Sequence, residues 1–120
     1  MTSITSTVED GIVKVRLSGT LTHGTLIAIA AAIADGDPSD AKLSLFDWLE
    51  IGSWDFSTPK EECIAALRTA AKQMVRVAIV HGRRVNRPVA WVAAILREEG
   101  VAVRSWRAQQ VAAAVAWLKV

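Results

Sequence analysis

The sequence predicts a single α/β domain over residues 1–120, with elements in the order ββαβαβαβα around a mostly parallel five-stranded sheet. Two observations carry this prediction. Segments with strand periodicity alternate with segments of helical periodicity, which favours right-handed crossovers between parallel strands. The first two strands are joined by Glu9-Asp10-Gly11, and an Asp-Gly turn is typical of a tight antiparallel hairpin.

The first hairpin and the first helix follow from local patterns. Val13, Val15 and Leu17 alternate with polar side chains, and Gly19 ends that alternation. Thr22 is an N-cap for a helix with one apolar face, and a turn over residues 35–38 that contains Gly and Pro stops this helix. We therefore expect strands over residues 3–8 and 12–18 and a helix over residues 22–34.

The middle of the chain forms the corner at which open α/β sheets usually carry their sites. The third strand runs into Asp47, and a long aromatic loop follows it. Thr58 and Glu61 have the spacing of a capping box, with Pro59 at the first helical position. We expect a strand over residues 42–48, a loop over residues 49–57 and a helix over residues 58–74.

The last elements have clear start and stop signals. Pro88 opens a helix that Gly100 closes, and Val111, Val115 and Leu118 have the spacing of one helical face. We expect strands over residues 75–80 and 101–104, a loop over residues 81–84, and helices over residues 88–99 and 107–118.

The strands alternate in polarity, so we expect helices mainly on one face of the sheet. Leu43 and Leu45 are expected on that face with the valines of the neighbouring strands. The opposite face is expected to carry Lys14, Arg16, Ser44, Arg76 and Arg104 around an apolar strip of Phe46, Ala78, Val80 and Ala102, which is either exposed to solvent or a contact surface.

Composition indicates a globular protein, with 52% hydrophobic and 22% charged residues. No apolar run approaches the roughly 20 residues that span a bilayer, so no membrane span is expected. The single Cys63 cannot form an internal disulfide, which indicates a cytoplasmic location. Residues 1–62 hold ten acidic and four basic side chains, whereas residues 63–120 hold two acidic and ten basic ones. This asymmetry favours self-association or an anionic partner, unless the fold interleaves the two halves.

The motifs of common enzymes and cofactor sites are missing from the sequence. Two His and one Cys have no paired spacing for metal ligands, and no glycine-rich nucleotide motif is present. A nucleophilic pair of Cys63 and His81 requires an activated thiol, but Cys63 lies inside a predicted helix, which favours a half-buried structural thiol. We therefore expect no catalytic residue, no metal and no cofactor, and the protein is not expected to be an enzyme.

The chain resembles the SpoIIAA-like branch of the STAS and CRAL-TRIO-related proteins. The residues that carry this resemblance are the hairpin ending in GIVKVRLSGTLT (11–22), the strands LSLFD (43–47) and VRVAIV (75–80), and the closing AVAWL (114–118).

This resemblance implies a bacterial regulatory binding module. In some such modules a serine in an Asp-Ser-Ser-Gly-Leu-like turn is phosphorylated, and Asp47 matches the acidic residue that ends the strand. Ser53 and Ser57 are not in that motif, so the resemblance does not extend to a phosphorylation switch. Larger CRAL-TRIO relatives bind apolar ligands, which leaves a small apolar ligand as an alternative.

Two groups of residues are candidates for contacts with a ligand or partner. His81, Arg83, Arg84 and Arg87 follow a strand and precede a helix, so they either bind an anion or form a solvated loop beside Asp47, Glu50 and Asp55. The aromatic residues Trp48, Trp54 and Phe56 follow the third strand, and we expect Trp48 to be mostly packed and the other two to cover a ligand or a partner.

The sequence therefore predicts a non-enzymatic, SpoIIAA-like module that acts through protein–protein contacts as a homodimer, with a regulatory protein as a possible partner. The alternative is a carrier or sensor of a small apolar or amphipathic ligand, held beside Trp48, Trp54 and Phe56. No nucleic-acid partner is expected. The surface that we expect to bind comprises Asp47, Trp48, Trp54, Phe56, His81, Arg83, Arg84 and Arg87.

Overall fold

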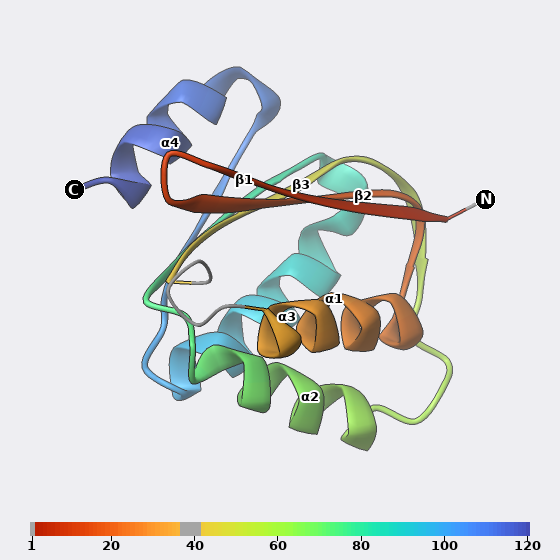
Figure 1. Ribbon diagram of the computed structural model, residues 1–120. Helices are drawn as coiled ribbons and strands as arrows, with labels where there is room; N and C mark the ends of the chain where they lie inside the picture. The colour runs from red at the N-terminus through yellow and green to blue at the C-terminus, as the bar shows by residue number, and fades with distance from the viewer. Residues whose placement is uncertain (1, 37–41) are drawn as a thin grey trace.

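The computed structural model describes residues 2–36 and 42–120 and confirms the predicted fold class (Figure 1). Five strands form one sheet in the order β1-β2-β3-β4-β5, in which β1 is antiparallel to β2 and all other neighbours are parallel. The expected turn over residues 35–38 lies partly outside the described residues. The elements are β1 (Ser3–Glu9), β2 (Ile12–Thr22), α1 (His23–Asp35), β3 (Leu43–Asp55), α2 (Glu61–Ala71), β4 (Arg76–His81), the 3-10 turn η1 (Arg83–Val85), α3 (Asn86–Glu98), β5 (Ala102–Trp106), the 3-10 turn η2 (Ala108–Gln110) and α4 (Val111–Leu118).

The expected hairpin between the first two strands is confirmed. Glu9 pairs with Ile12, which leaves a two-residue loop of Asp10 and Gly11. Both loop residues have positive φ, 53° and 77°, as a type I′ turn requires. This turn matches the natural twist of the two strands and so defines their register.

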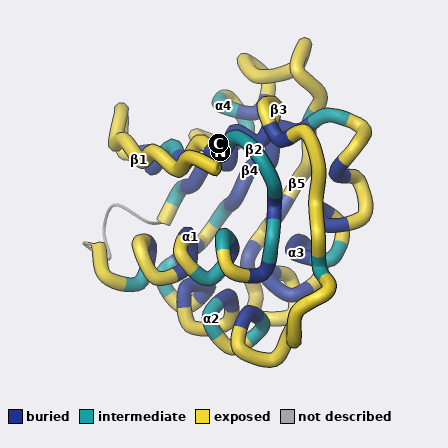
Figure 2. Tube along the Cα trace, turned by 90° about the vertical axis from the view of Figure 1, so that its right-hand side faces the viewer, coloured by how far each residue is buried: buried dark blue, intermediate teal, exposed yellow. Residues whose placement is uncertain are grey.

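Three helices, α1, α2 and α3, cover one face of the sheet, and the short α4 lies on the other (Figure 1). The larger core lies between the sheet and the three helices, and its buried residues appear in dark blue in Figure 2. On the other face, α4 covers part of the predicted apolar strip. That part is therefore neither exposed to solvent nor available to contact a partner. The second core cluster consists of Ile12, Leu45, Ala78, Val80, Ala114 and Leu118.

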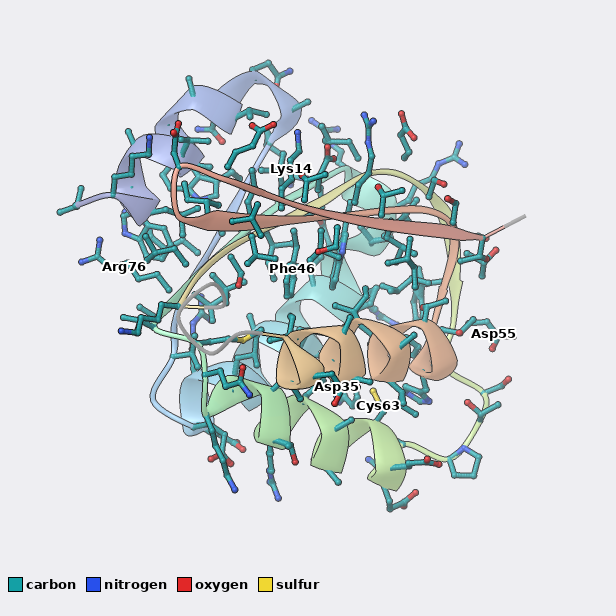
Figure 3. The ribbon with its side chains drawn as sticks, in the orientation of Figure 1. Lys14, Asp35, Phe46, Asp55, Cys63 and Arg76 are labelled. Atoms are coloured by element: carbon teal, nitrogen blue, oxygen red, sulfur yellow. The ribbon has the colours of Figure 1, made fainter. Side chains whose placement is uncertain are left out.

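The expected orientation of β3 is wrong. Its register pairs Ser44 with Val13 and Phe46 with Val15, and directly paired residues share a face. Ser44 and Phe46 therefore face the three helices, whereas Leu45 faces α4. Figure 3 shows Phe46 on the helix side of the sheet and Lys14 on the opposite side. Apolar residues occupy both faces of β3, so its own periodicity could not decide its orientation.

The end of the second strand and the long loop after the third were also predicted wrongly. β2 continues past Gly19, and β3 continues through most of the expected loop, because the two strands pair beyond their expected ends. Leu21, for example, pairs with Trp54. Gly19 has φ of 98°, and the register shifts next to it let both strands continue through an irregularity.

Of the two predicted helix caps, one is confirmed and the other is wrong. Thr22 caps α1 as predicted, and its side-chain oxygen accepts a hydrogen bond from the N–H of Thr25. The expected capping box of Thr58 and Glu61 is wrong, because α2 begins at Glu61 behind Lys60, which makes no side-chain cap. The first turn of the expected helix is therefore extended chain that belongs to the corner after β3.

The remaining boundaries shift by a few residues. The expected loop over residues 81–84 contains the end of β4 and the start of η1, and α3 begins at Asn86 rather than at Pro88. Gly100 ends α3 with a φ of 89°, which confirms its predicted role. Among residues 2–36 and 42–120, no helix is both long and apolar enough to cross a membrane.

Candidate functional site

An aromatic surface forms where the end of β3 meets the first turns of α3. The ring of Phe56 lies 5.5 Å from that of Trp54 and 5.3 Å from that of Trp91, measured between centroids. With Arg87 and Pro88, these rings line a hollow of about 210 Å³. Trp54 is 38% exposed, whereas Phe56 and Trp91 are half-buried. We call these five residues the aromatic patch.

The aromatic patch is held from behind by His23. This residue is buried at the start of α1, and its ring stacks on Phe56 with a centroid distance of 4.3 Å. Its Nδ1 donates to the carbonyl oxygen of Thr58 at 2.9 Å, which ties α1 to the chain after β3. Hydrogen bonds from the side chain and backbone of Ser57 lower the pKa of Asp55 and hold the same corner. These contacts pre-form the patch.

Three of the residues selected from the sequence therefore come together: Trp54, Phe56 and Arg87. Trp91 and the supporting His23 were missed. A signal for Trp91 was present, since it lies four residues after Arg87 and so one turn along the same face of a helix. The contact between Phe56 and His23 had no such signal, because it depends on the packing of α1.

Arg83 and Arg84 lie in η1, outside the aromatic patch. They line a separate hollow of about 470 Å³ together with the middle of β3. Arg84 Nη1 donates to the carbonyl oxygen of Gly52 at 3.4 Å. Glu50 lines the same hollow, as the solvated-loop alternative anticipated, but its carboxylate pairs with Arg16 at 3.5 Å.

Asp47 and Trp48 are engaged in contacts within the protein itself. Asp47 is 9% exposed, its Oδ2 lies 3.6 Å from Arg16 Nε, and its Oδ1 accepts the N–H of Leu49. Trp48 is fully buried and stacks on Phe46 with centroids 5.4 Å apart. The expected packing of Trp48 is confirmed, and neither residue lies in the aromatic patch.

His81 lies at a cleft of about 390 Å³ between α3 and the edge strand β5. The residue is 5% exposed, and burial lowers the pKa of its ring. Its Nδ1 donates to the carbonyl oxygen of Gly82 at 2.8 Å, so Nε2 is the hydrogen-bond acceptor of the neutral ring. The other residues that line this cleft are Asn86, Val89, Ala90, Ala93, Arg97, Ser105, Trp106, Arg107 and Gln110.

The cleft beside His81 is lined by two arginines and by apolar side chains such as those of Val89 and Trp106. Arg97 Nη2 donates to the carbonyl oxygen of Val103 at 2.7 Å, and Arg107 Nη1 donates to Asn86 Oδ1 at 3.3 Å. Both guanidinium groups keep further N–H donors, and no acidic side chain is among the residues that line the cleft. Such a lining suits an amphipathic anion. Apart from His81, the sequence prediction missed this cleft, because its residues come from four separate segments.

The remaining candidate nucleophile is buried. Cys63 has no exposed surface, and burial raises its pKa to about 11. It is therefore a more deeply buried thiol than the half-buried one expected, and it is protonated at neutral pH. Over the part of the chain that the structure describes, no group of His, Cys, Asp and Glu side chains could hold a metal ion.

Comparison with known proteins identifies the fold. No protein-family model and no curated protein matches the sequence. The structure is similar to the crystal structure of an uncharacterized DUF3478-family protein with a SpoIIAA-like fold from Shewanella loihica. The TM-score is 0.66 at 16% sequence identity, over 98% of this chain and 95% of that chain. The chain therefore has the SpoIIAA-like fold that its sequence predicted.

Proposed function

We propose that the protein is a non-enzymatic, cytoplasmic module that binds a regulatory protein partner through the aromatic patch and acts as a homodimer. The observation that carries this proposal is the exposed Trp54 beside a hollow built from Phe56, Trp91 and Arg87. Partly exposed Trp and Arg side chains around an apolar hollow are the usual anchors of protein interfaces. The single buried Cys63 supports the cytoplasmic location.

The size of the hollow favours a protein partner at this position. At about 210 Å³, it is smaller than the roughly 300–1,000 Å³ of typical small-molecule pockets. A hollow of this size accepts one apolar side chain of a partner. Arg87 at its rim adds a donor for a carboxylate or carbonyl group of the same partner.

The chemistry of the other candidate residues supports a binding role over catalysis. The thiol of Cys63 is buried with a raised pKa, and Asp47 is engaged by Arg16. His81 lies in a different cleft from the aromatic patch. A nucleophile and its base need to lie within hydrogen-bond distance of each other, and no hydrogen bond joins these three side chains.

The proposal is tested by capturing partners from a lysate of the source organism and measuring their affinity. We expect Trp54→Ala to weaken binding of the captured protein by about 2 kcal/mol, or roughly 30-fold in Kd, because truncation removes an interface anchor. Val75→Ala is the matched control, since Val75 is an exposed apolar residue that directly precedes β4. Equal affinity of Trp54→Ala and Val75→Ala for that protein would contradict the proposal.

The alternative is a carrier or sensor of a small amphipathic ligand, and the cleft beside His81 favours it. Its position differs from the expected one beside Trp48, Trp54 and Phe56. Trp48 packs against Phe46, and Trp54 and Phe56 line the hollow of the aromatic patch instead. Two guanidinium groups and several apolar lining residues suit an organic anion with an apolar body.

The carrier alternative is tested with anilinonaphthalene sulfonate, a fluorescent amphipathic anion. If the cleft binds such ligands, Arg107→Gln should weaken dye binding about tenfold, because a charge-assisted hydrogen bond is lost. Trp54→Ala should leave binding unchanged. A loss of binding in Trp54→Ala and not in Arg107→Gln would instead assign the dye to the aromatic patch. Native mass spectrometry of the purified protein shows directly whether a small molecule is retained.

A further inference from the structure

β1 is an open edge of the sheet. All seven residues of Ser3–Glu9 are exposed, and the strand is yellow along its length in Figure 2. Exposed edge strands usually carry Lys, Pro or a bulge that prevents pairing with another chain. β1 contains neither Lys nor Pro, its register with β2 is regular, and its one charged residue is the terminal Glu9. The edge is therefore competent to pair with a further strand.

The type I′ turn determines which backbone groups of β1 face outward. In a two-residue hairpin, the flanking pair, here Glu9 and Ile12, exchanges both hydrogen bonds. Hydrogen-bonded and non-hydrogen-bonded pairs then alternate along the strand. The N–H and C=O groups of Ile4, Ser6 and Val8 consequently point away from β2, towards the open edge.

We propose that a second copy of this chain pairs with β1, antiparallel, about a two-fold axis at Ser6. In this register Ser6 pairs with Ser6 of the partner subunit, and Ile4 pairs with Val8 of the partner subunit. Each pair exchanges two hydrogen bonds, so three pairs form about six. The result is a continuous sheet across the dimer. This inference rests on the homodimer of the proposed function and on no other part of it.

The side chains of β1 support this register. Ile4 pairs with Leu17 and Val8 pairs with Val13, so both side chains lie on the face that α1 covers. Ile4 is 37% exposed and Val8 is 53% exposed in the single chain. In the dimer, the isoleucine of each copy lies opposite the valine of the other and buries this apolar surface. On the opposite face, Thr5 lies across from Thr7 of the partner subunit, a favourable cross-strand pair.

α1 supplies a second, independent reason for a partner on this side. The helix lies beneath β1 and β2 (Figure 1), and Asp35 at its end is its one charged residue. Its exposed positions before Asp35 are Gly24, Ala28, Ala31 and Ala32. Exposed helix faces are usually polar, and small side chains instead permit close approach of another element. The two α1 helices would flank the apolar cluster of Ile4 and Val8.

Other registers pair fewer of the outward-facing residues of β1 with suitable residues of the partner subunit. A shift of the two-fold axis by one residue, to Thr5, places Ile4 opposite Ser6 of the partner subunit and leaves Val8 beyond the start of the partner strand. A shift in the other direction places Ile4 opposite Asp10 of the partner subunit, in the turn. Only the axis at Ser6 pairs all three outward-facing residues of β1 while keeping apolar residues opposite each other.

The inference is tested by measuring the dimer dissociation constant by sedimentation velocity. Ser6→Pro removes an outward N–H group but none of the hydrogen bonds between β1 and β2, so the hairpin should be retained. We expect the dimer dissociation constant to rise roughly 30-fold. A matched pair of double variants tests the register. Ile4→Lys with Val8→Lys places like charges opposite each other and should give a monomer. The double variant Ile4→Lys with Val8→Glu places opposite charges at the same two positions. It should form a tighter dimer than the variant with two lysines.

The outcomes separate the two proposals. If the wild-type chain is a dimer and both double variants dimerise equally, the β1 interface is wrong while the homodimer stands. If the wild-type chain is a monomer at high concentration, both the homodimer and this inference fail, and the aromatic patch is unaffected. Circular dichroism of each variant confirms that it folds before its dissociation constant is compared.

Discussion

His81 shows how burial and one backbone contact set the state of a side chain. The ring is 5% exposed, and its Nδ1–H is bonded to the carbonyl oxygen of Gly82. Burial lowers the pKa of the ring, and the nearby positive charge of Arg107 lowers it further, whereas the Gly82 contact opposes both effects. The neutral ring with an accepting Nε2 is therefore the stable form at the cleft.

This lowered pKa predicts a loss of stability in mild acid. As the pH falls below about 6.5, the unfolded chain protonates His81 before the folded protein does, so protons favour unfolding. We expect the wild-type protein to lose more stability between about pH 7.5 and about pH 5.5 than His81→Gln does. Urea unfolding at both pH values measures the difference. His23 is present in both proteins and cancels, so equal losses would show that His81 does not have a lowered pKa.

At the residue scale, the sequence predicted part of the candidate site. Trp54, Phe56 and Arg87 could be selected because aromatic and basic residues after strands are common contacts. Their common location could not be predicted, because it depends on β3 continuing far enough to reach α3. Asp47 looked like a site residue for its place at the carboxyl end of a strand, yet its partner Arg16 belongs to the neighbouring strand.

At the scale of elements, two threonines with the same predicted role differ in their surroundings. Thr22 precedes α1 directly and forms reciprocal hydrogen bonds with Thr25. Thr58 lies before α2, but its carbonyl oxygen and hydroxyl group both contact His23 Nδ1, at 2.9 and 3.2 Å. A contact from a helix that lies far away in the sequence therefore replaces the local cap, and helix propensity alone could not reveal it.

These two threonines form a matched pair for mutation. Thr22→Ala should lower the free energy of unfolding by about 1 kcal/mol, because it leaves N–H groups of the first turn of α1 without a partner. Thr58→Ala should change it by no more than about 0.5 kcal/mol, since the carbonyl contact to His23 is retained. Chemical denaturation gives both values. A larger loss for Thr58→Ala would mean that the Thr58 hydroxyl group itself stabilises the fold, through its contact with His23 or as a cap of α2.

At the scale of the whole molecule, the fold could be predicted because independent signals agreed. The Asp10-Gly11 turn requires an antiparallel start, and alternating strand and helix patterns require parallel crossovers. The layer that α4 forms, on the face of the sheet opposite the other three helices, was harder to predict. α4 is short, and the apolar residues it covers, Ala78 and Val80, are small enough to pass for an exposed strip. The opposite faces of β3 carry similar apolar residues, so only pairing with β2 and β4 decides its orientation.

The extra length of β3 has a mechanical consequence. β4 ends at His81, opposite Trp48, so the part of β3 that leads to Trp54 pairs with β2 alone. A two-stranded ribbon opens more readily than the centre of a sheet, and the register of this ribbon is irregular beside Gly19. Amide hydrogens in this ribbon should accordingly exchange faster than those of β4. The aromatic patch therefore has one wall on α3 and one wall at the end of this two-stranded ribbon.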